Sequence, residues 1–455
     1  MTQLSAFQPL ILDETGPFEP ALLNRWDRMA HEIALDPTGP VIESYDTAGN
    51  RIDRIRLPES VRELRREVVE AGIFNNGSQT ELLQKTFCLS HIGEASVCCP
   101  LACTEGLIRV IEAVGSDFLK KTYLPKLRSA ETPLAGSQFI TEQDCGSDVG
   151  ALQTRAVPDK EGSFRLYGEK WFCSAIDDFF LIAARPEGAP IGTRGVAIFF
   201  VPRMRDGSLN QIRIKRLKNK LGTRELPTAE IDLEGTLAYP IGPLQDSFKN
   251  LMNHVINTSR LMNAACALGF MNRALLEAEN YCRQRRAFGK VLNEHPMVKQ
   301  GLASMHARFN GLKNLFFSLG ADLDKNPTKE PSLWQRFLIN LCKYRTSIAA
   351  TWMVHEAILL LGGNGTIETF SILPRLYRDS MVLESWEGSH NTLALQICRD
   401  GVKFPFREMI EERLRPNPVP AGFEKLTDED WVAENARRFV DSIGDALEKG
   451  SSVSL

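Results

Sequence analysis

One carboxylate stands in a short loop directly before a predicted helix near the C-terminal end of the chain. Glu387 lies between Trp386 and Gly388, and Ser389 is a suitable N-cap for the helix that carries Leu393. A carboxylate in such a loop can project into a cavity, and the free N–H groups of a helix start attract an anionic or oxygen-rich ligand. Surface acids that pair with a helix dipole have the same pattern, so both interpretations stay open.

Two segments upstream could meet a flat, polar cofactor. In the predicted strand 170–175, Phe172 and Ser174 share one face by the two-residue period, which combines an aromatic wall with a hydroxyl. Residues 138–148 are rich in small and hydroxyl side chains, and such loops offer N–H groups and hydroxyls to a ligand. A core position for Phe172 and a capped turn at 138–148 explain the same residues.

Two further segments could meet a phosphate-bearing ligand. Residues 283–290 place Arg285 and its basic neighbours at the end of a long predicted helix, where a guanidinium can grip a pyrophosphate or simply complement the helix dipole. Gly362 and Gly363 follow an apolar helical run, where they could allow close backbone approach of a ligand or form a helix C-cap.

Composition places the chain among ordinary globular proteins. Its 455 residues are 43% apolar and 24% charged, which predicts two or three subdomains. The 54 basic and 57 acidic side chains nearly cancel, so no net field recruits DNA or anionic lipid. Apolar runs are far shorter than the roughly 20 residues of a membrane-spanning helix, and residues 1–7 lack the order of a secretory signal. The Cys residues form no CxxC pair, which favours buried thiols in a reducing cytoplasm and no metal site.

The texture of the sequence changes twice along the chain. Helical spacing dominates 60–130, short β-rich runs follow up to about 241, and helical periodicity returns in a long helix ending near 286 and at about 295–323, 332–361 and 389–403. We predict an α+β fold with an N-terminal helical domain (1–132), a middle β-sheet or barrel domain (133–244), a C-terminal four-helix-bundle domain (245–405) and a tail (406–455). The tail has 7 basic and 11 acidic residues, which argues against a nucleic-acid-binding arm.

These segments, in this order and with this alternation of helical and β texture, resemble the acyl-CoA dehydrogenase superfamily of flavoproteins over about residues 60–405. The resemblance implies FAD as cofactor. It assigns Ile140 and Thr141 to the isoalloxazine ring and Arg285, with Phe288, to an RxxFG pattern whose Arg meets the pyrophosphate of FAD across a dimer interface. The complete set of implied cofactor-binding residues is Ile140, Thr141, Ser147, Phe172, Ser174, Arg285, Phe288, Gly362, Gly363, Ser389 and Asn391.

The resemblance also implies a reaction. Glu387 falls on the position of the catalytic base, which would remove the α-proton of an acyl-CoA thioester while the β-hydride leaves to flavin N5. Removal of this weakly acidic proton needs a carboxylate stripped of water, and the backbone N–H of Glu387 is the implied donor to the thioester oxygen. The residues implied to bind substrate are Ser147, Asn257, Arg260 and Gly388.

The partners implied are an acyl-CoA, an acceptor such as electron-transfer flavoprotein, and further copies of the chain in a homotetramer built as a dimer of dimers. The expected setting is cytoplasmic fatty acid metabolism, with no membrane insertion and no nucleic acid.

Three departures from the usual pattern favour the AidB-type branch: Gln143 in place of Pro, Pro296 in place of Gln, and Leu359 in place of Gln. Two alternative functions follow from the resemblance. One is an acyl-CoA oxidase that uses oxygen, and the other is an AidB-type, flavin-containing stress or nucleic-acid-associated protein with weak dehydrogenase activity.

Overall fold

The computed structural model of the chain describes residues 16–36, 38–131, 135–205, 207–327, 330–415 and 417–451. They fall into two compact units. The β unit comprises Arg28–Asn75 and Glu94–Ser259, and the helical unit comprises the described residues up to Asp27, Asn76–Gly93 and those from Arg260 onward. The segment 1–7 and the predicted boundary at 132 and 133 lie outside the described residues. The predicted N-terminal helical range contributes to both units, and the four-part domain division stays a prediction.

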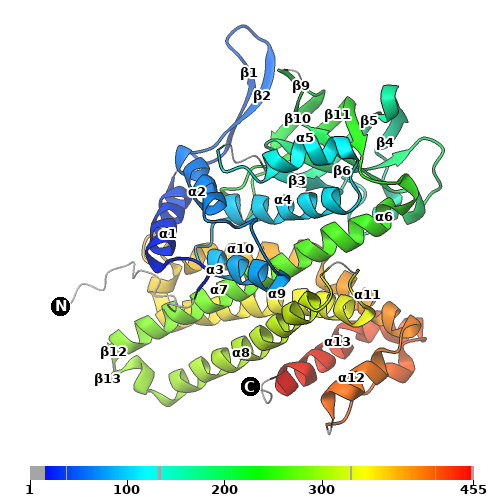
Figure 1. The fold of residues 1–455 in the computed structure, drawn as a ribbon. Helices are drawn as coiled ribbons and strands as arrows, with labels where there is room; N and C mark the ends of the chain where they lie inside the picture. The colour runs from blue at the N-terminus through cyan, green and yellow to red at the C-terminus, as the bar shows by residue number, and fades with distance from the viewer. Residues whose placement is uncertain are drawn as a thin grey trace. The chain divides into compact units, whose positions relative to one another are not determined.

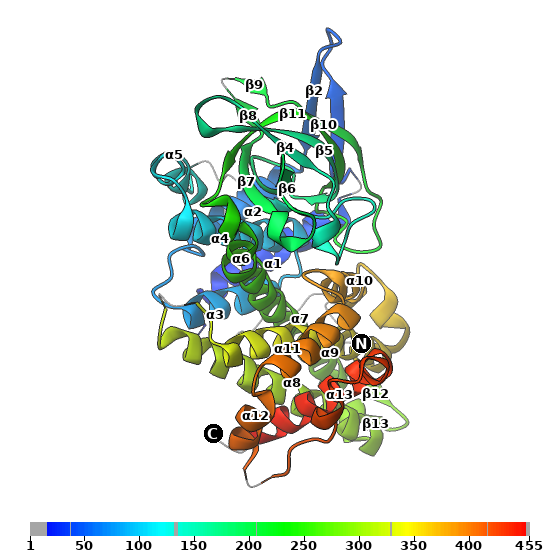
Figure 2. The same cartoon turned by 90° about the vertical axis from the view of Figure 1, so that its right-hand side faces the viewer.

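The β unit is built on strands that pair into a closed ring. Antiparallel pairs join β11 to β5, β5 to β4, β6 to β7 and β7 to the end of β11, while β4 runs parallel to β6. Because β7 pairs with both β6 and β11, the ring β11-β5-β4-β6-β7 closes on itself (Figure 2). Strands β10 and β3 extend it, on β11 and β6 respectively. The bounds are β3 (Gly136–Phe139), β4 (Arg155–Pro158), β5 (Phe164–Ser174), β6 (Phe179–Pro186), β7 (Ala197–Pro202), β8 (Met204–Arg205), β9 (Ser208–Leu209), β10 (Ile212–Leu217) and β11 (Thr228–Pro240).

Two strands of the ring are apolar on both faces. Phe180 and Phe199 belong to the core inside the ring, whereas Phe179, Leu181 and Phe200 pack against α4 and α5 on its outer side. The continuous apolar sequences of β6 and β7 follow from this double burial, since a strand covered on both faces loses its polar alternation. The helices of the β unit are α2 (Glu59–Glu70), α4 (Ala95–Val114), α5 (Asp117–Leu127), α6 (Ser247–Asn250) and a π-helical turn (Leu251–Ile256).

A hairpin of β1 (Val41–Tyr45) and β2 (Arg51–Arg56), blue in Figure 1, lies within the range that was predicted to be helical. The helical texture of the flanking sequence does not predict this hairpin. The division between the units falls within α1 (Pro20–Leu35) and within α7 (Asn257–Gln284).

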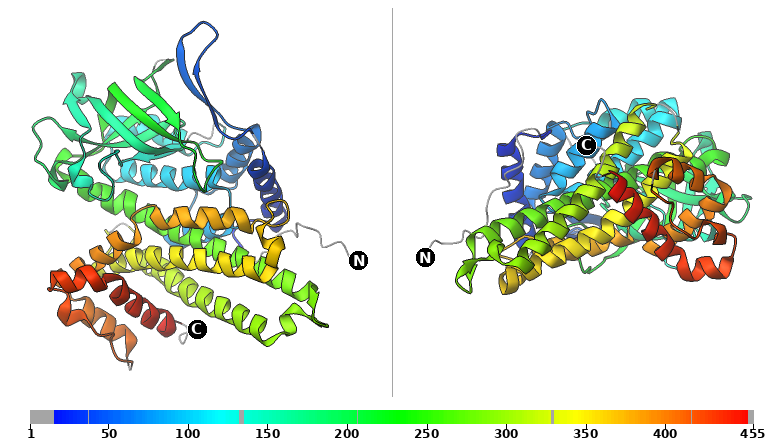
Figure 3. Two further views of the ribbon diagram at one scale, coloured as in Figure 1. Left: turned by 180° about the vertical axis from the view of Figure 1, so that it is seen from behind. Right: turned by 90° about the horizontal axis from the view of Figure 1, so that it is seen from below.

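The helical unit contains long helices whose predicted ranges agree closely with the structure. Its elements are α3 (Gln79–Ser90), most of α7, α8 (Pro296–Asp324), α9 (Leu333–Leu361), α10 (Leu373–Ser385), α11 (His390–Lys403), α12 (Phe406–Leu414), α13 (Glu429–Ser451) and a short hairpin of β12 (Arg286–Ala287) and β13 (Lys290–Val291). Helices α8 and α9 run side by side with α13 next to them (Figure 3). Helix α10, which was not predicted, precedes the Glu387 loop. The α+β fold class is confirmed.

The two ends of α9 show why this helix has its observed length. Ser332 and Gln335 form a capping box at its start, in which each side chain satisfies a backbone N–H of the other residue. At its end Gly362 has a φ of 61°, a conformation that glycine adopts without steric cost and that stops the helix.

The segment after residue 405 folds onto the bundle through a charged clamp. Arg345 of α9 is almost fully buried and pairs with three carboxylates of α13: Asp441 (2.9 Å), Asp445 and Glu448 (2.7 Å). Arg308 of α8 pairs with Glu448 at 2.8 Å. Three acidic side chains of the tail therefore form ion pairs with arginines of α8 and α9.

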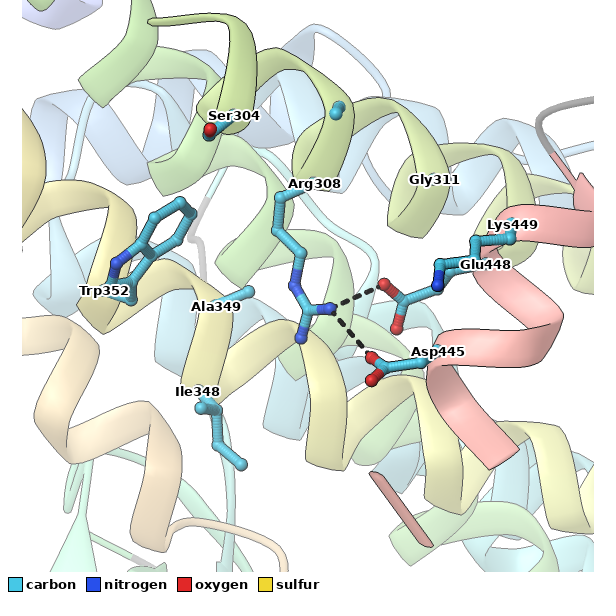
Figure 4. A pocket seen from close by; sticks show the side chains of 10 residues that line it. Ser304, Arg308, Gly311, Ile348, Ala349, Trp352, Asp445, Glu448 and Lys449 are labelled. Atoms are coloured by element: carbon cyan, nitrogen blue, oxygen red, sulfur yellow. Dashed lines mark hydrogen bonds and ion pairs between the residues drawn. The ribbon is translucent and has the colours of Figure 1, made fainter. Parts of the chain in front are cut away.

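A cavity of about 610 Å³ opens beside this clamp, between α8, α9 and α13 (Figure 4). Trp352 and Arg308 line it, and Arg308 extends toward the carboxylates of Asp445 and Glu448. None of the residues predicted to bind cofactor or substrate lies in this cavity.

In the described part of the chain, no helix is both long and apolar enough to cross a bilayer.

Replacing the buried guanidinium of the clamp tests how α13 is held. Arg345→Met leaves the Glu448 carboxylate buried with only Arg308 as a partner, so we expect the free energy of local opening of α13 to fall by about 3 kcal/mol. Hydrogen exchange of α13 peptides in the full chain measures this energy. Arg438→Met, an exposed change on the same helix, is the control and should change exchange little. Unaltered protection of α13 in Arg345→Met would contradict the clamp.

Candidate active site

Glu387 occupies a tight connection between α10 and α11. The last helical residue of α10 is Ser385, and α11 begins at His390 with Ser389 as its N-cap residue. Glu387 has a φ of 58° and Gly388 a φ of 108°. A left-handed conformation at a glutamate costs on the order of 1–3 kcal/mol and persists only where the surroundings impose it. The strained residue is thus the one that the sequence pattern singled out.

Two buried cations lie against the backbone of this connection. Arg260 of α7 donates from Nε to the Glu387 carbonyl (3.0 Å) and from Nη1 to Asn340 Oδ1 (2.6 Å). Lys343 of α9 donates from Nζ to the carbonyls of Glu384 (2.9 Å) and Gly388 (2.8 Å). The two cations therefore bind three carbonyls, one in the last turn of α10 and two in the connection.

Burial and charge act in opposite directions on the Glu387 carboxylate. Burial raises its pKa, while Arg260 and Lys343 pull it down. Among the described residues, no side chain or backbone N–H donates a hydrogen bond to this carboxylate. A carboxylate that is desolvated, held near two cations and not hydrogen-bonded is suited to accept a proton from a ligand.

Both cations are less basic than in water. Burial lowers the pKa of Lys343 to about 7, although Glu387 opposes this change. Burial likewise lowers the pKa of Arg260 to about 10. His390 follows the connection at the start of α11, and burial lowers its pKa to about 4, which keeps the imidazole neutral near pH 7.

Other residues predicted to hold a cofactor lie exposed in the helical unit. Ser389 and Asn391 are exposed at the start of α11, where the Ser389 hydroxyl contacts Thr392 (3.0 Å) instead of capping the helix. Gly362 and Gly363 are exposed, with no atom within 4 Å of where a Cβ would stand, so the backbone is open to a ligand.

The hairpin of β12 and β13 carries the RxxFG residues. Arg285 is exposed, and Phe288 at the turn is 97% exposed with a φ of 49°. An aromatic side chain this exposed buries almost none of its surface within its own chain, apart from an edge contact with the His295 ring, so its apolar surface is available to a ligand or a second copy.

In the β unit, a buried ion pair fixes the segment at Ile140 and Thr141. Lys170 donates to the Ile140 carbonyl (3.0 Å) and to Glu142 (2.8 Å), and Glu142 also accepts from the N–H groups of Gln153 and Thr154. The Trp171 N–H donates to the Thr141 carbonyl (2.9 Å), so this segment lies beside β5.

The outward face of β5 presents the predicted ring-binding pair. Phe172 is 54% exposed, and Lys218 Nζ lies 4.7 Å from its ring centre. The Ser174 hydroxyl bonds to Thr228 Oγ1 (2.9 Å). Ser147 is exposed in the loop, and Asn257 is buried at the start of α7. Phe172 is therefore not a core residue, which removes the structural alternative left open by the sequence.

The structure brings together Glu387, Gly388 and Arg260 in the helical unit and places Ile140 and Thr141 beside β5 in the β unit. Sequence reasoning missed Lys343, Asn340 and the Glu142–Lys170 pair. A signal for the first two was present, because Asn340 interrupts the apolar run 337–342 of α9 and Lys343 follows it about one turn later.

Comparison with known proteins is consistent with this arrangement. The model of the acyl-CoA dehydrogenase middle domain matches residues 137–236, and that of the acyl-CoA dehydrogenase C-terminal domain matches residues 248–401. Acyl-CoA dehydrogenase family member 11 of Caenorhabditis elegans is 32% identical over 406 residues, which are 82% of this chain and 65% of that protein. This chain thus spans just under two thirds of the length of that relative.

One further relative and one solved structure extend the likeness. AidB of Escherichia coli K12 is 30% identical over 382 residues, covering 79% of this chain and 69% of that protein. The structure of ACDH-11 of C. elegans in complex with C11-CoA superposes with a TM-score of 0.84 at 26% identity, covering 95% of this chain and 81% of that one. Both the sequence and the fold lead to one conclusion: the chain belongs to the acyl-CoA dehydrogenase family.

Proposed function

We propose that the protein catalyses the FAD-dependent α,β-dehydrogenation of an acyl-CoA thioester with Glu387 as the base. The observation that carries this proposal is the Glu387 carboxylate itself, which is partly buried, lies near two cations and receives no hydrogen bond from the part of the chain that the structure describes. Members of the family are FAD-dependent flavoproteins. A relative solved with C11-CoA supports an acyl-CoA as the class of ligand.

The residues present fit the FAD group. In the β unit, the exposed Phe172 can pack on a flat ring while Ser174 and the backbone at Thr141 offer polar contacts to its edge. In the helical unit, Arg285 supplies a guanidinium suited to a pyrophosphate, and Gly362 and Gly363 leave open backbone. The remaining residues proposed to hold FAD are Ile140, Ser147, Phe288, Ser389 and Asn391.

The chain's own residues then supply the proton step. The ionised Glu387 carboxylate accepts the α-proton of the thioester, and the electron pair of that C–H bond moves into the new Cα–Cβ double bond. FAD, when bound, is the two-electron acceptor for the hydrogen that leaves the β-carbon. The N–H of Glu387 is the proposed donor to the thioester oxygen, with Ser147, Asn257, Arg260 and Gly388 proposed to contact substrate.

The proposed acceptor is electron-transfer flavoprotein, and the proposed assembly is a homotetramer. Oxygen as acceptor is the alternative within the same chemistry, and peroxide release in air distinguishes the two. The AidB-type alternative with nucleic acid is not favoured, because the segment after residue 405 is acidic overall and three carboxylates of its helix α13 dock on Arg345 and Arg308 of the same chain.

Glu387→Gln tests the identity of the base. The amide keeps the size of the side chain but cannot accept the α-proton, so we expect the anaerobic reduction of bound FAD by an acyl-CoA to slow by about 10²–10⁴-fold. Flavin content and acyl-CoA binding should stay near those of the unmodified protein. Rapid bleaching of the flavin band in this variant would refute the assignment.

The pH dependence of flavin reduction reports the state of the same carboxylate. Because burial raises the pKa of Glu387, its ionised form is lost at a higher pH than for an ordinary glutamate. The acidic limb of kcat/KM should therefore have its midpoint above 4.5, the ordinary value for this residue type. A midpoint at or below that value would show that a different group titrates.

Phe288→Asp tests the proposed assembly through the β12–β13 hairpin. A charge in place of this exposed aromatic should lower both the mass measured by light scattering and the flavin absorbance per chain, since Arg285 is proposed to bind FAD across subunits. Ile191→Asp, which alters another side chain that is 91% exposed, serves as the control. Full mass and full flavin content in Phe288→Asp would contradict this part of the proposal.

A further inference from the structure

Lys343 is a fully buried lysine in the middle of α9, and its nitrogen is directed at the Glu387 connection. Its side chain has no solvent exposure. The two carbonyls that it holds belong to Glu384, at the end of α10, and to Gly388. They lie on either side of Glu387 in the chain, so one ammonium group ties together the residues that flank the proposed base.

The cost of this placement calls for a physical reason. Moving an ammonium group out of water is expensive, and an apolar side chain of similar size would fill the space without that cost. The two hydrogen bonds from Nζ recover part of the cost. An apolar residue could neither donate hydrogen bonds to the two carbonyls nor place a positive charge beside the Glu387 carboxylate.

The hold on the backbone accounts for the strained conformation of Glu387. Arg260 binds the carbonyl of Glu387 itself, and Asn340 in turn fixes the guanidinium. With the carbonyls of Glu384, Glu387 and Gly388 all bound to buried cations, the backbone between them cannot relax from its positive φ without breaking hydrogen bonds.

We propose that Lys343 is a positioning residue for the base: it fixes the backbone on both sides of Glu387, and its charge favours the ionised, proton-accepting form of that carboxylate. This inference rests on the proposed role of Glu387. It adds a residue that lies far from the active loop in the sequence and that does not itself touch the reacting atoms.

Geometry and charge respond differently to pH. Protonated Lys343 has three N–H donors and the neutral amine has two, so both forms can satisfy the two carbonyls. The charge is present below the lowered pKa of about 7 and is lost above it. The charged or titratable groups that face this site are Glu387, Glu384 on α10, Arg260 on α7, His390 on α11, and Arg437 and Asp441 on α13.

Three substitutions separate the two effects. Lys343→Met removes both hydrogen bonds and the charge, Lys343→Gln keeps a donor without the charge, and Lys343→Arg keeps both. Lys299→Met, at an exposed position of α8, is the matched control.

The first readout is hydrogen exchange of residues 384–391 in the purified full chain, which does not depend on turnover. We expect exchange at least about 10-fold faster in Lys343→Met, with Lys343→Arg and Lys299→Met close to the unmodified protein. The second readout is the acidic limb of flavin reduction. Loss of the positive charge raises the pKa of Glu387, so the limb should move to higher pH by about one unit in both Lys343→Met and Lys343→Gln.

The inference is overturned if the connection in Lys343→Met exchanges at the same rate as in the unmodified protein, or if the acidic limb does not move in Lys343→Gln. Should Lys343→Met fail to fold, the comparison of Lys343→Gln with Lys343→Arg still decides the role of the charge. Failure of the proposed function is distinguishable, because Glu387→Gln would then retain flavin reduction regardless of how the Lys343 variants exchange.

Discussion

Burial of two cations beneath one strained loop is the interaction on which the proposed chemistry depends. Lys343 and Arg260 together bind three carbonyls at the end of α10 and in the connection to α11, and these contacts oppose relaxation of Glu387 from its left-handed conformation. The same two charges lower the pKa of the carboxylate and so offset part of the increase that burial causes, which favours the ionised form. The same two cations thus determine both the backbone conformation at Glu387 and the protonation of its carboxylate.

A comparable arrangement supports the proposed cofactor surface of the β unit. There the buried Lys170 donates to the carbonyl of Ile140 and to the carboxylate of Glu142. The Glu142 carboxylate also accepts a hydrogen bond from the backbone N–H of Thr154. In each unit a buried lysine donates to backbone carbonyls of a loop that carries residues proposed to bind a ligand: Lys170 at Ile140, and Lys343 at the Glu387 connection. Buried charges of this kind cost stability unless they are fully paired, which is why both lysines have two acceptors.

Local sequence signals were sufficient to predict the Glu387 loop, the long helices and the fold class. Glu387, Gly388 and Ser389 are adjacent in the chain and directly precede the apolar periodicity of α11, so the sequence is enough to locate this loop, although the Ser389 side chain does not cap the helix. The long helices were predictable because their apolar periodicity extends over many residues, and the class of fold followed from the order of helical and β segments. The two-residue period of a strand puts Phe172 and Ser174 on one face, but the sequence leaves open whether that face is core, and the structure shows Phe172 to be exposed.

The supporting contacts were not predictable because they join residues that are far apart in sequence. Lys343 reaches carbonyls 41 and 45 residues away, and Arg260 reaches one 127 residues away. The clamp of Arg345 on α13 spans about 100 residues, so the acidic tail gave no local sign of where it docks. The hairpin of β1 and β2 was missed because its two short strands are flanked by strongly helical sequence.

The central claim, that Glu387 removes the α-proton, can be separated from the redox step by a thioester with no hydrogen on its β-carbon, such as 3,3-dimethylbutanoyl-CoA. In D₂O, proton NMR follows the exchange of its α-hydrogens in the presence of the flavin-loaded protein. We predict steady loss of the α-hydrogen signal with the unmodified protein and none above background with Glu387→Gln. Equal exchange rates for the two proteins would contradict the account.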